Sequence, residues 1–215
     1  IEPVHVSGDE DSWLASTDGL WGFGGDTPIP LTDDGSLNVL ALGDGNGNVS
    51  FSDNNQKAGV GVDINQSAKI DSDDALLIHL DGSTNSATVS IAQFNANQAE
   101  IGRWTAYNDV GEEVGSGQFN PVNNNGFPFD LSISTTESFS YLQFSLDTAG
   151  TNSNAGYVVS EMDYTPTREF EQDTFTYTVE DQDGSTAEGT LSAYALSDDL
   201  NPVIGTEGAD ELVGS

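Results

Sequence analysis

The chain of 215 residues carries 36 acidic residues against four basic ones, which gives a formal net charge of −32. Such a density of carboxylates destabilises a compact state unless cations bind or screen part of the charge. The basic residues, Lys57, Lys69, Arg103 and Arg168, form no patch, which argues against nucleic-acid binding. No stretch approaches the roughly 20 apolar residues of a membrane-spanning helix. The chain has no cysteine. If the protein is extracellular, bound ions would therefore have to supply the stabilisation that disulfides supply in small secreted domains.

Alternation of apolar and polar residues along the chain predicts an all-β fold. Strands are expected at residues 37–42, 75–80, 87–94, 101–107, 129–133, 142–146, 156–164, 174–179 and 191–195. The run 75–80 is apolar except for His79, which predicts a strand in the centre of a sheet. The Gly-rich segment 20–26 is expected to be a loop, and polar turns are expected from Asp81 and from Asn108. The spacing of about ten residues favours an antiparallel β-sandwich, jelly-roll or lectin-like.

Proline and charge interrupt the strand pattern at residues 165–172, which indicates a boundary. The residues that follow are typical of one hairpin, and an isolated hairpin is at best marginally stable. It either completes the main sandwich or pairs with the first 40 residues around an inserted middle. The expected division is a ligand-binding β-sandwich at 1–166, a terminal hairpin at 167–200 and a short repeat-like segment at 201–215.

The sequence DGNGNVS places Asp44, Asn46 and Asn48 at alternate positions, similar to the first half of an EF-hand loop. Gly45 and Gly47 between them permit a tight turn. Calcium suits oxygen ligands of this kind, and any remaining ligands would have to come from elsewhere in the fold. An ordinary Asn-Gly turn is the alternative.

A second candidate calcium site lies just before the predicted central strand. Its acidic residues are Asp63, Asp71, Asp73 and Asp74. Gly59 and Gly61 precede them and lack side chains, so their backbone could approach an ion or a ligand closely. If one coordination position stays open, a ligand carboxylate or a pair of sugar hydroxyls could fill it. This is the preferred recognition site, and a solvated acidic loop is its competitor.

Other residues are further candidates for binding calcium or a ligand. Asp181 and Asp183 lie in a turn that could hold calcium, although a type I′ hairpin turn explains Asp-Gly equally well. Two aromatic residues on or beside a strand and two amides in the TNSN segment could contact a ligand. These residues are Trp104, Tyr107, Asn152 and Asn154. Trp21 and Phe23 carry the same weak expectation, since most aromatic residues of a sandwich belong to its core.

The end of the chain, VIGTEGADELVGS, resembles the start of an RTX nonapeptide array, with Asp210 at the calcium-ligand position and Thr206 in place of a glycine. The segment 175–192 is similar to the final hairpin of the Ig-like or cadherin-like domains of large bacterial RTX adhesins. The middle of the chain resembles the ligand-binding modules of those adhesins, through GVGVD, IDSDDALLIHL, IGRWTAYNDVGEEVGSGQF and SNAGYVVSEMDY in that order.

The resemblance implies a secreted, bacterial cell-surface protein whose calcium-dependent β-sandwich binds a peptide or a glycan on another cell, as a monomeric module of a very large chain. Where the resemblance leads us to expect Gly-Glu, this chain has Asp73 and Asp74, and the shorter carboxylate reaches less far. We expect calcium to ligate the C-terminal carboxylate of a peptide in cell attachment and biofilm formation. The alternatives are a lectin that binds vicinal diols through calcium and a calcium-rigidified spacer. No enzyme is expected, because His5 and His79 lie far apart and no catalytic motif is present.

Overall fold

The computed structural model separates into two compact units, Ile1–Thr167 (unit 1) and Arg168–Ser215 (unit 2). The residues that the structure describes are 2–24, 28–43, 45, 48–62, 68–72, 74–98, 100–122, 125–148, 155–167, 170–180 and 182–196. Within this part of the chain, no helix is both long enough and apolar enough to cross a bilayer.

Unit 1 is built almost entirely from antiparallel strands. They are β1 (Val4–Ser7), β2 (Thr17–Phe23), β3 (Val49–Ser52), β4 (Gly59–Val62), β5 (Ala75–Ala92), β6 (Ile101–Tyr107), β7 (Glu113–Phe119), β8 (Phe129–Thr148) and β9 (Val158–Tyr164). Helical turns occur at α1 (Glu10–Ala15), η1 (Val39–Ala41), η2 (Asn55–Lys57) and η3 (Ala96–Gln98). The prediction of an all-β antiparallel sandwich is confirmed.

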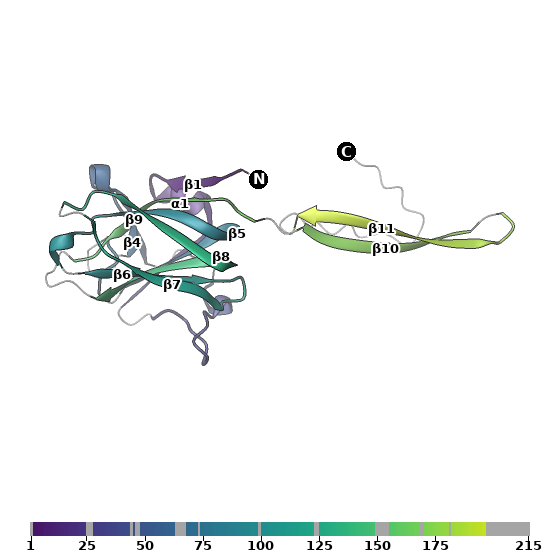
Figure 1. The fold of residues 1–215 in the computed structure, drawn as a ribbon, viewed down its shortest axis with the longest axis horizontal. Helices are drawn as coiled ribbons and strands as arrows, with labels where there is room; N and C mark the ends of the chain where they lie inside the picture. Colours follow the sequence, from purple (N-terminus) through teal and green to yellow (C-terminus); the bar gives the residue numbers. More distant parts are fainter. Residues whose placement is uncertain are drawn as a thin grey trace. The chain divides into compact units, whose positions relative to one another are not determined.

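Two long strands, β5 and β8, pair along their length and contribute to both layers of the sandwich (Figure 1). In layer 1, the first part of β5 lies between β2 and β8, and β6 and β7 follow. In layer 2, the second part of β5 lies between β8 and β9, and β9 pairs with β1 and β4 on its other side. The pairing of β5 with β8 shifts register between His79 and Ser86, where the strands pass from one layer to the other.

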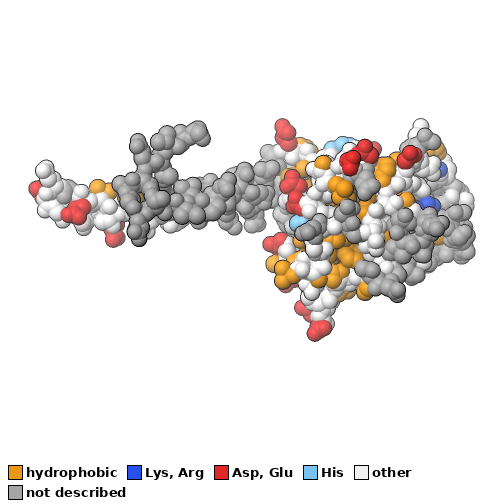
Figure 2. Space-filling view, turned by 180° about the vertical axis from the view of Figure 1, so that it is seen from behind, with side chains coloured by type: hydrophobic (Ala, Val, Ile, Leu, Met, Phe, Trp, Pro, Cys, Tyr) orange, Lys and Arg blue, Asp and Glu red, His pale blue; other side chains and the backbone are white. Residues whose placement is uncertain are grey.

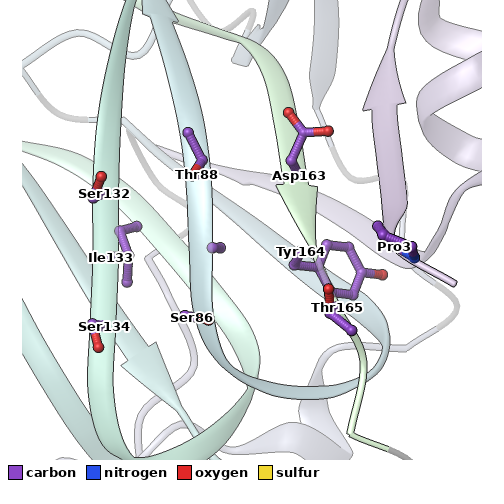
Figure 3. A pocket seen from close by; sticks show the side chains of 10 residues that line it. Pro3, Ser86, Thr88, Ser132, Ile133, Ser134, Asp163, Tyr164 and Thr165 are labelled. Carbon is purple, nitrogen blue, oxygen red and sulfur yellow. The ribbon is translucent and has the colours of Figure 1, made fainter. Parts of the chain in front are cut away.

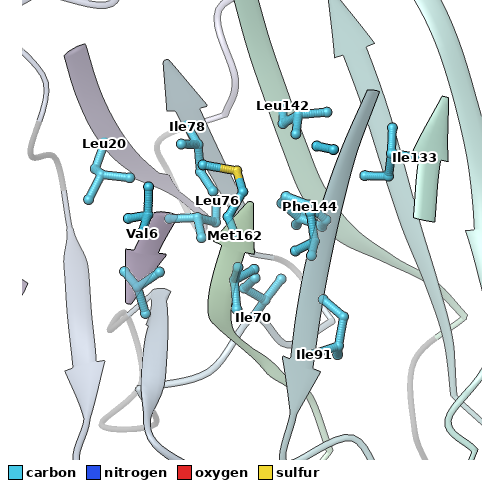
Figure 4. Packing of buried hydrophobic residues seen from close by; sticks show 14 of the residues in the cluster. Val6, Leu20, Ile70, Leu76, Ile78, Ile91, Ile133, Leu142, Phe144 and Met162 are labelled. Atoms are coloured by element: carbon cyan, nitrogen blue, oxygen red, sulfur yellow. The ribbon is translucent and has the colours of Figure 1, made fainter. Parts of the chain in front are cut away.

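The core lies between the layers, because successive side chains of a strand point to opposite faces. Leu76 and Ile78 of β5 and Leu142 and Phe144 of β8 point into it and are fully buried (Figure 4). Each such side chain contributes about 1.5–3 kcal/mol by leaving water. The predicted strand at 75–80 is therefore central and covered on both faces, with only His79 partly exposed.

Three local predictions are wrong. Residues 37–42 form no strand; they contain η1, and the Leu37 N–H donates to the carbonyl of Gly111 at 2.7 Å. Residues 20–23 of the predicted loop belong to strand β2. The predicted turn from Asp81 lies inside β5, where the register shift accommodates it. The predicted turn from Asn108 does join β6 to β7, with the Asn108 N–H donating to Glu112 O at 2.9 Å.

The described residues of unit 2 form a hairpin of β10 (Phe170–Glu180) and β11 (Thr186–Leu196), which pair in unbroken register. Gly184 takes a φ of +79° in the connecting turn, a conformation that favours glycine. The predicted hairpin is present. The first forty residues contribute β1 and β2, which pair with β9 and β5 of unit 1. The expected repeat segment at 201–215 lies outside the described residues.

Candidate functional site

The glycines of β4 serve the packing of the chain on itself. A Cβ atom on Gly59 would lie 2.6 Å from the carbonyl oxygen of Val159, and one on Gly61 would lie 2.7 Å from the carbonyl oxygen of Ala68. Both glycines are buried. The backbone approach that the sequence predicted for these positions is therefore made by neighbouring segments of the chain.

These contacts bring together segments that are far apart in the sequence. Ile70 and Tyr157 form an isolated antiparallel bridge, with N–H···O distances of 2.8 and 3.2 Å. The bridge sets the segment before the central strand beside Gly156, which follows the TNSN residues in the chain. A Cβ atom on Gly156 would lie 2.7 Å from the carbonyl oxygen of Ile70, so the two backbones touch.

Glu100 lies at this junction and is 2% exposed. Its Oε1 atom accepts a hydrogen bond from the Gly156 N–H at 2.5 Å. Its Oε2 atom is buried and has no hydrogen-bond partner among the described residues. Burial raises the pKa of Glu100, while the Gly156 N–H and the charge of Lys69 partly oppose the rise. We refer to Glu100, Lys69, Ile70, Asp71 and Gly156 as the Glu100 site.

A buried carboxylate with one unsatisfied oxygen needs either a proton or a cation, because the desolvated charge is otherwise costly. Lys69 is attracted to both Glu100 and Asp71, and burial lowers its pKa. Tyr157 is fully buried, and burial together with the charge of Glu100 raises its pKa. The Glu100 site thus holds one carboxylate shielded from water, together with the charges of Lys69 and of the partly exposed Asp71.

Sequence reasoning missed Glu100. The residue follows the polar segment 95–99 and directly precedes β6, so it has the pattern of an ordinary solvated charge. Its burial depends on contacts with residues 69–71 and 155–157, which no local pattern reveals. A carboxylate directly before a predicted strand was the available signal.

The predicted metal ligands are distributed as follows. Asp71 is partly exposed, and Asp74 is 4% exposed and donates its N–H to Asp71 O at 3.2 Å. Asn48 takes a φ of +49° just before β3, and Asp183 is exposed in the hairpin turn. Outside the described residues lie Asp44, Asn46, Asp63, Asp73, Asn152, Asn154, Asp181 and Asp210. In the part of unit 1 and unit 2 that is described, no three His, Asp or Glu side chains gather closely enough to hold a metal.

The two aromatic residues predicted for a ligand site point to opposite faces of β6. Trp104 packs against the main core and lies over Gly117, whose Cβ would be 2.8 Å from the indole Nε1. Tyr107 lies on the outer face of layer 1, where its hydroxyl donates to Gln143 Oε1 at 2.8 Å. One ligand cannot contact both side chains in this arrangement.

A shallow groove of about 410 Å³ runs over the outer face of layer 2 (Figure 3). Hydroxyl groups of Ser86 and Thr88 from β5 and of Ser132 and Ser134 from β8 line it, beside Asp163 from β9. The Asp163 carboxylate already contacts His5 Nδ1 at 2.6 Å. The groove is therefore open and of mixed polar and apolar character, with its carboxylate engaged by the chain itself.

No known protein-family model matches this chain, and no curated protein matches it either.

Proposed function

We propose that unit 1 is a calcium-dependent ligand-binding module of a secreted bacterial RTX adhesin, which attaches cells by holding the C-terminal carboxylate of a peptide on a partner cell. The observation that supports this proposal is the half-satisfied Glu100 carboxylate, buried beside the segment that leads into β5. The acidic composition and the resemblance to adhesin modules support it independently.

The donor set fits calcium. Carboxylate oxygens from Glu100 and Asp71 and backbone carbonyls of the Ile70–Tyr157 junction are hard oxygen ligands, which calcium accepts in numbers of six to eight. When bound, calcium would add its positive charge to that of Lys69 beside the two carboxylates, and it can leave one position for a ligand oxygen. Glu100 would be held in place by the Gly156 N–H, so that its orphaned Oε2 faces the ion.

Rigid support is the second requirement of such a site. Gly61 and Gly156 let three backbone segments meet at contact distance, and Tyr157 anchors its segment by donating its hydroxyl to Ser145 O at 2.8 Å. The carboxylates therefore sit on backbone that the core fixes. A preorganised shell loses less entropy when ion and ligand bind.

Binding of peptides with and without a free C-terminus tests the proposal. Fluorescence anisotropy would be measured in millimolar calcium and again in EDTA, at constant ionic strength. We expect binding to need both calcium and the free carboxylate, so that amidated peptides and EDTA samples give no signal. Binding that is unchanged by EDTA would refute the proposal.

Two other outcomes would replace the proposed peptide binding with a different function. A glycan-array signal that free monosaccharide displaces would identify a lectin, in which vicinal diols complete the calcium shell. Calcium-dependent melting without capture of any peptide or glycan would identify a structural spacer.

A further inference from the structure

A second hollow lies on the outer face of layer 1, away from the Glu100 site. It has a volume of about 430 Å³. Its lining consists of Asp18, Trp21, Val39, Leu42, Gly43, His79 and Tyr141. We call it the aromatic pocket. Among the described residues of its lining, the titratable groups are Asp18, His79 and the Tyr141 phenol, and none is a lysine or arginine.

The sheet register builds the aromatic pocket. Gly19, His79 and Tyr141 lie directly opposite one another on β2, β5 and β8. The His79 and Tyr141 rings stack with centroids 4.2 Å apart and planes 9° apart. Gly19 leaves room for the Trp21 indole, since a Cβ there would lie 2.4 Å from it. The Trp21 Nε1–H donates to Leu42 O at 2.7 Å, which fixes the indole as one wall.

A β-bulge supplies the carboxylate of the aromatic pocket. The register of β2 shifts between Thr17 and Gly19, so Asp18 is the extra residue and its side chain reaches the outer face. Its Oδ2 atom lies 4.0 Å from His79 Nε2, and its side chain is 50% exposed. A carboxylate at the mouth of an aromatic hollow is thus open to solvent on one side.

The electrostatics of the aromatic pocket favour a cation. Burial lowers the pKa of His79, which keeps the ring neutral at pH 7, although Asp18 acts in the opposite direction. Burial raises the pKa of Tyr141, and the charges of Asp18 and Asp109 add to the rise, so two carboxylates lie near this ring. Arg103 lies on the same face of the sheet and contacts Asp147 at 3.6 Å.

We propose that the aromatic pocket binds a cationic side chain, arginine above all, of a partner peptide. A planar guanidinium can direct its N–H groups at the Asp18 carboxylate and lie against the His79 side chain, which is 28% exposed, whereas Trp21 and Tyr141 are only 6% and 8% exposed. Hydrophobic side chains gather on one face of unit 1, with carboxylates around them (Figure 2). Leu40, which lies between the lining residues Val39 and Leu42 in the chain, is 95% exposed and offers an apolar contact. This site is additional to the proposed calcium-dependent function and does not depend on it.

Capped peptides test the proposal without involving a terminal carboxylate. Acetyl-Gly-Arg-Gly-amide and its neutral analogue with citrulline would be titrated into the ¹⁵N-labelled protein in calcium buffer at physiological salt. The readout is the indole N–H resonance of Trp21, identified by its loss in Trp21→Phe. We expect a saturable shift with the arginine peptide and an affinity about tenfold lower with citrulline, the size of a charge-assisted hydrogen bond to a carboxylate.

Two matched variants separate the aromatic pocket from the general attraction of an acidic protein for cations. Asp18→Asn should weaken arginine binding several-fold, since it removes the carboxylate of the pocket. Asp53→Asn removes the same charge at an exposed position after β3 and should bind as the unchanged protein does. Melting temperatures would establish that both variants fold. The comparison of the arginine and citrulline peptides uses the unchanged protein, so it does not depend on the folding of either variant.

Three results would overturn the proposal. Equal affinity for the citrulline peptide would show that charge is not recognised. Equal losses in Asp18→Asn and Asp53→Asn would show non-specific attraction. A Trp21 shift caused by a methyl glycoside, with none caused by the arginine peptide, would identify a sugar pocket instead.

Discussion

Replacing Glu100 with glutamine should change stability in opposite directions with and without calcium. Glutamine keeps an oxygen that can accept the Gly156 N–H and removes the buried negative charge. Because burial raises the pKa of Glu100, the carboxyl costs nothing below the unfolded-state pKa, and its penalty develops as the pH rises through the folded-state pKa. At neutral pH without a cation, the protein carries that penalty.

The size of the stability change in each buffer follows from what glutamine removes, which is one buried charge in EDTA and one calcium ligand in calcium. In EDTA, Glu100→Gln removes one desolvated charge but leaves a buried amide, so we expect a gain of about 1 kcal/mol. A gain of that size raises the melting temperature by about 2–4 °C in a unit of this length. In calcium at 100 times its dissociation constant, loss of the ion's stabilisation costs about 2.7 kcal/mol. The net result in calcium is then a loss of about 2 kcal/mol.

Thermal unfolding followed by circular dichroism would measure both values at pH 7 and low salt. Asp53→Asn is the matched control, because it removes one exposed carboxylate without touching the Glu100 site. A change of the same sign and size in both buffers would refute the reasoning, since it would assign Glu100 a purely structural role.

Three further predictions can be checked by standard measurements. Millimolar calcium should raise the melting temperature of the unchanged protein at low salt, and an EDTA-treated sample that melts at the same temperature would contradict the calcium assignment. Gly61→Ala should cost about 1–3 kcal/mol in urea unfolding, because its Cβ would lie 2.7 Å from Ala68 O; a cost near zero would argue against the close approach. Burial raises the pKa of Tyr164 to about 12, so stability should be lost as the pH rises from about 10 towards 12. Tyr164→Phe should unfold at higher pH, yet lose about 1 kcal/mol at pH 7 because the Asp81 N–H loses its acceptor, 2.9 Å away.

The strands that the sequence predicts correctly are those whose side-chain period is visible locally. Leu142 and Phe144 alternate with polar residues because one face of β8 meets the core and the other does not. The same period identifies β6 and the hairpin of unit 2. Patterns of this kind need no knowledge of distant residues.

The failed predictions depend on contacts between distant residues. Leu37, Val39 and Leu42 are apolar because they cover the outer face of layer 1, and the Leu37 N–H donates to Gly111 O instead of to a neighbouring strand. The glycines of segment 20–26 suggested a loop, but residues 20–23 pair with β5, and the preceding Gly19 lets the Trp21 ring lie along the strand. Burial of Glu100 needs the Ile70–Tyr157 junction. Each of these features depends on tertiary contacts and produces no periodic pattern of apolar residues in the local sequence.

The pairing of β1 with β9 determines how unit 1 would respond to mechanical tension. Val4 lies opposite Tyr164, so the chain enters and leaves the sandwich at adjacent points of one antiparallel ladder. Force applied at those two points would break the hydrogen bonds between β1 and β9 one after another. It would not load all of them at the same time, as shear along the strands does. The Glu100 site and the aromatic pocket would bear none of this force until β1 had detached.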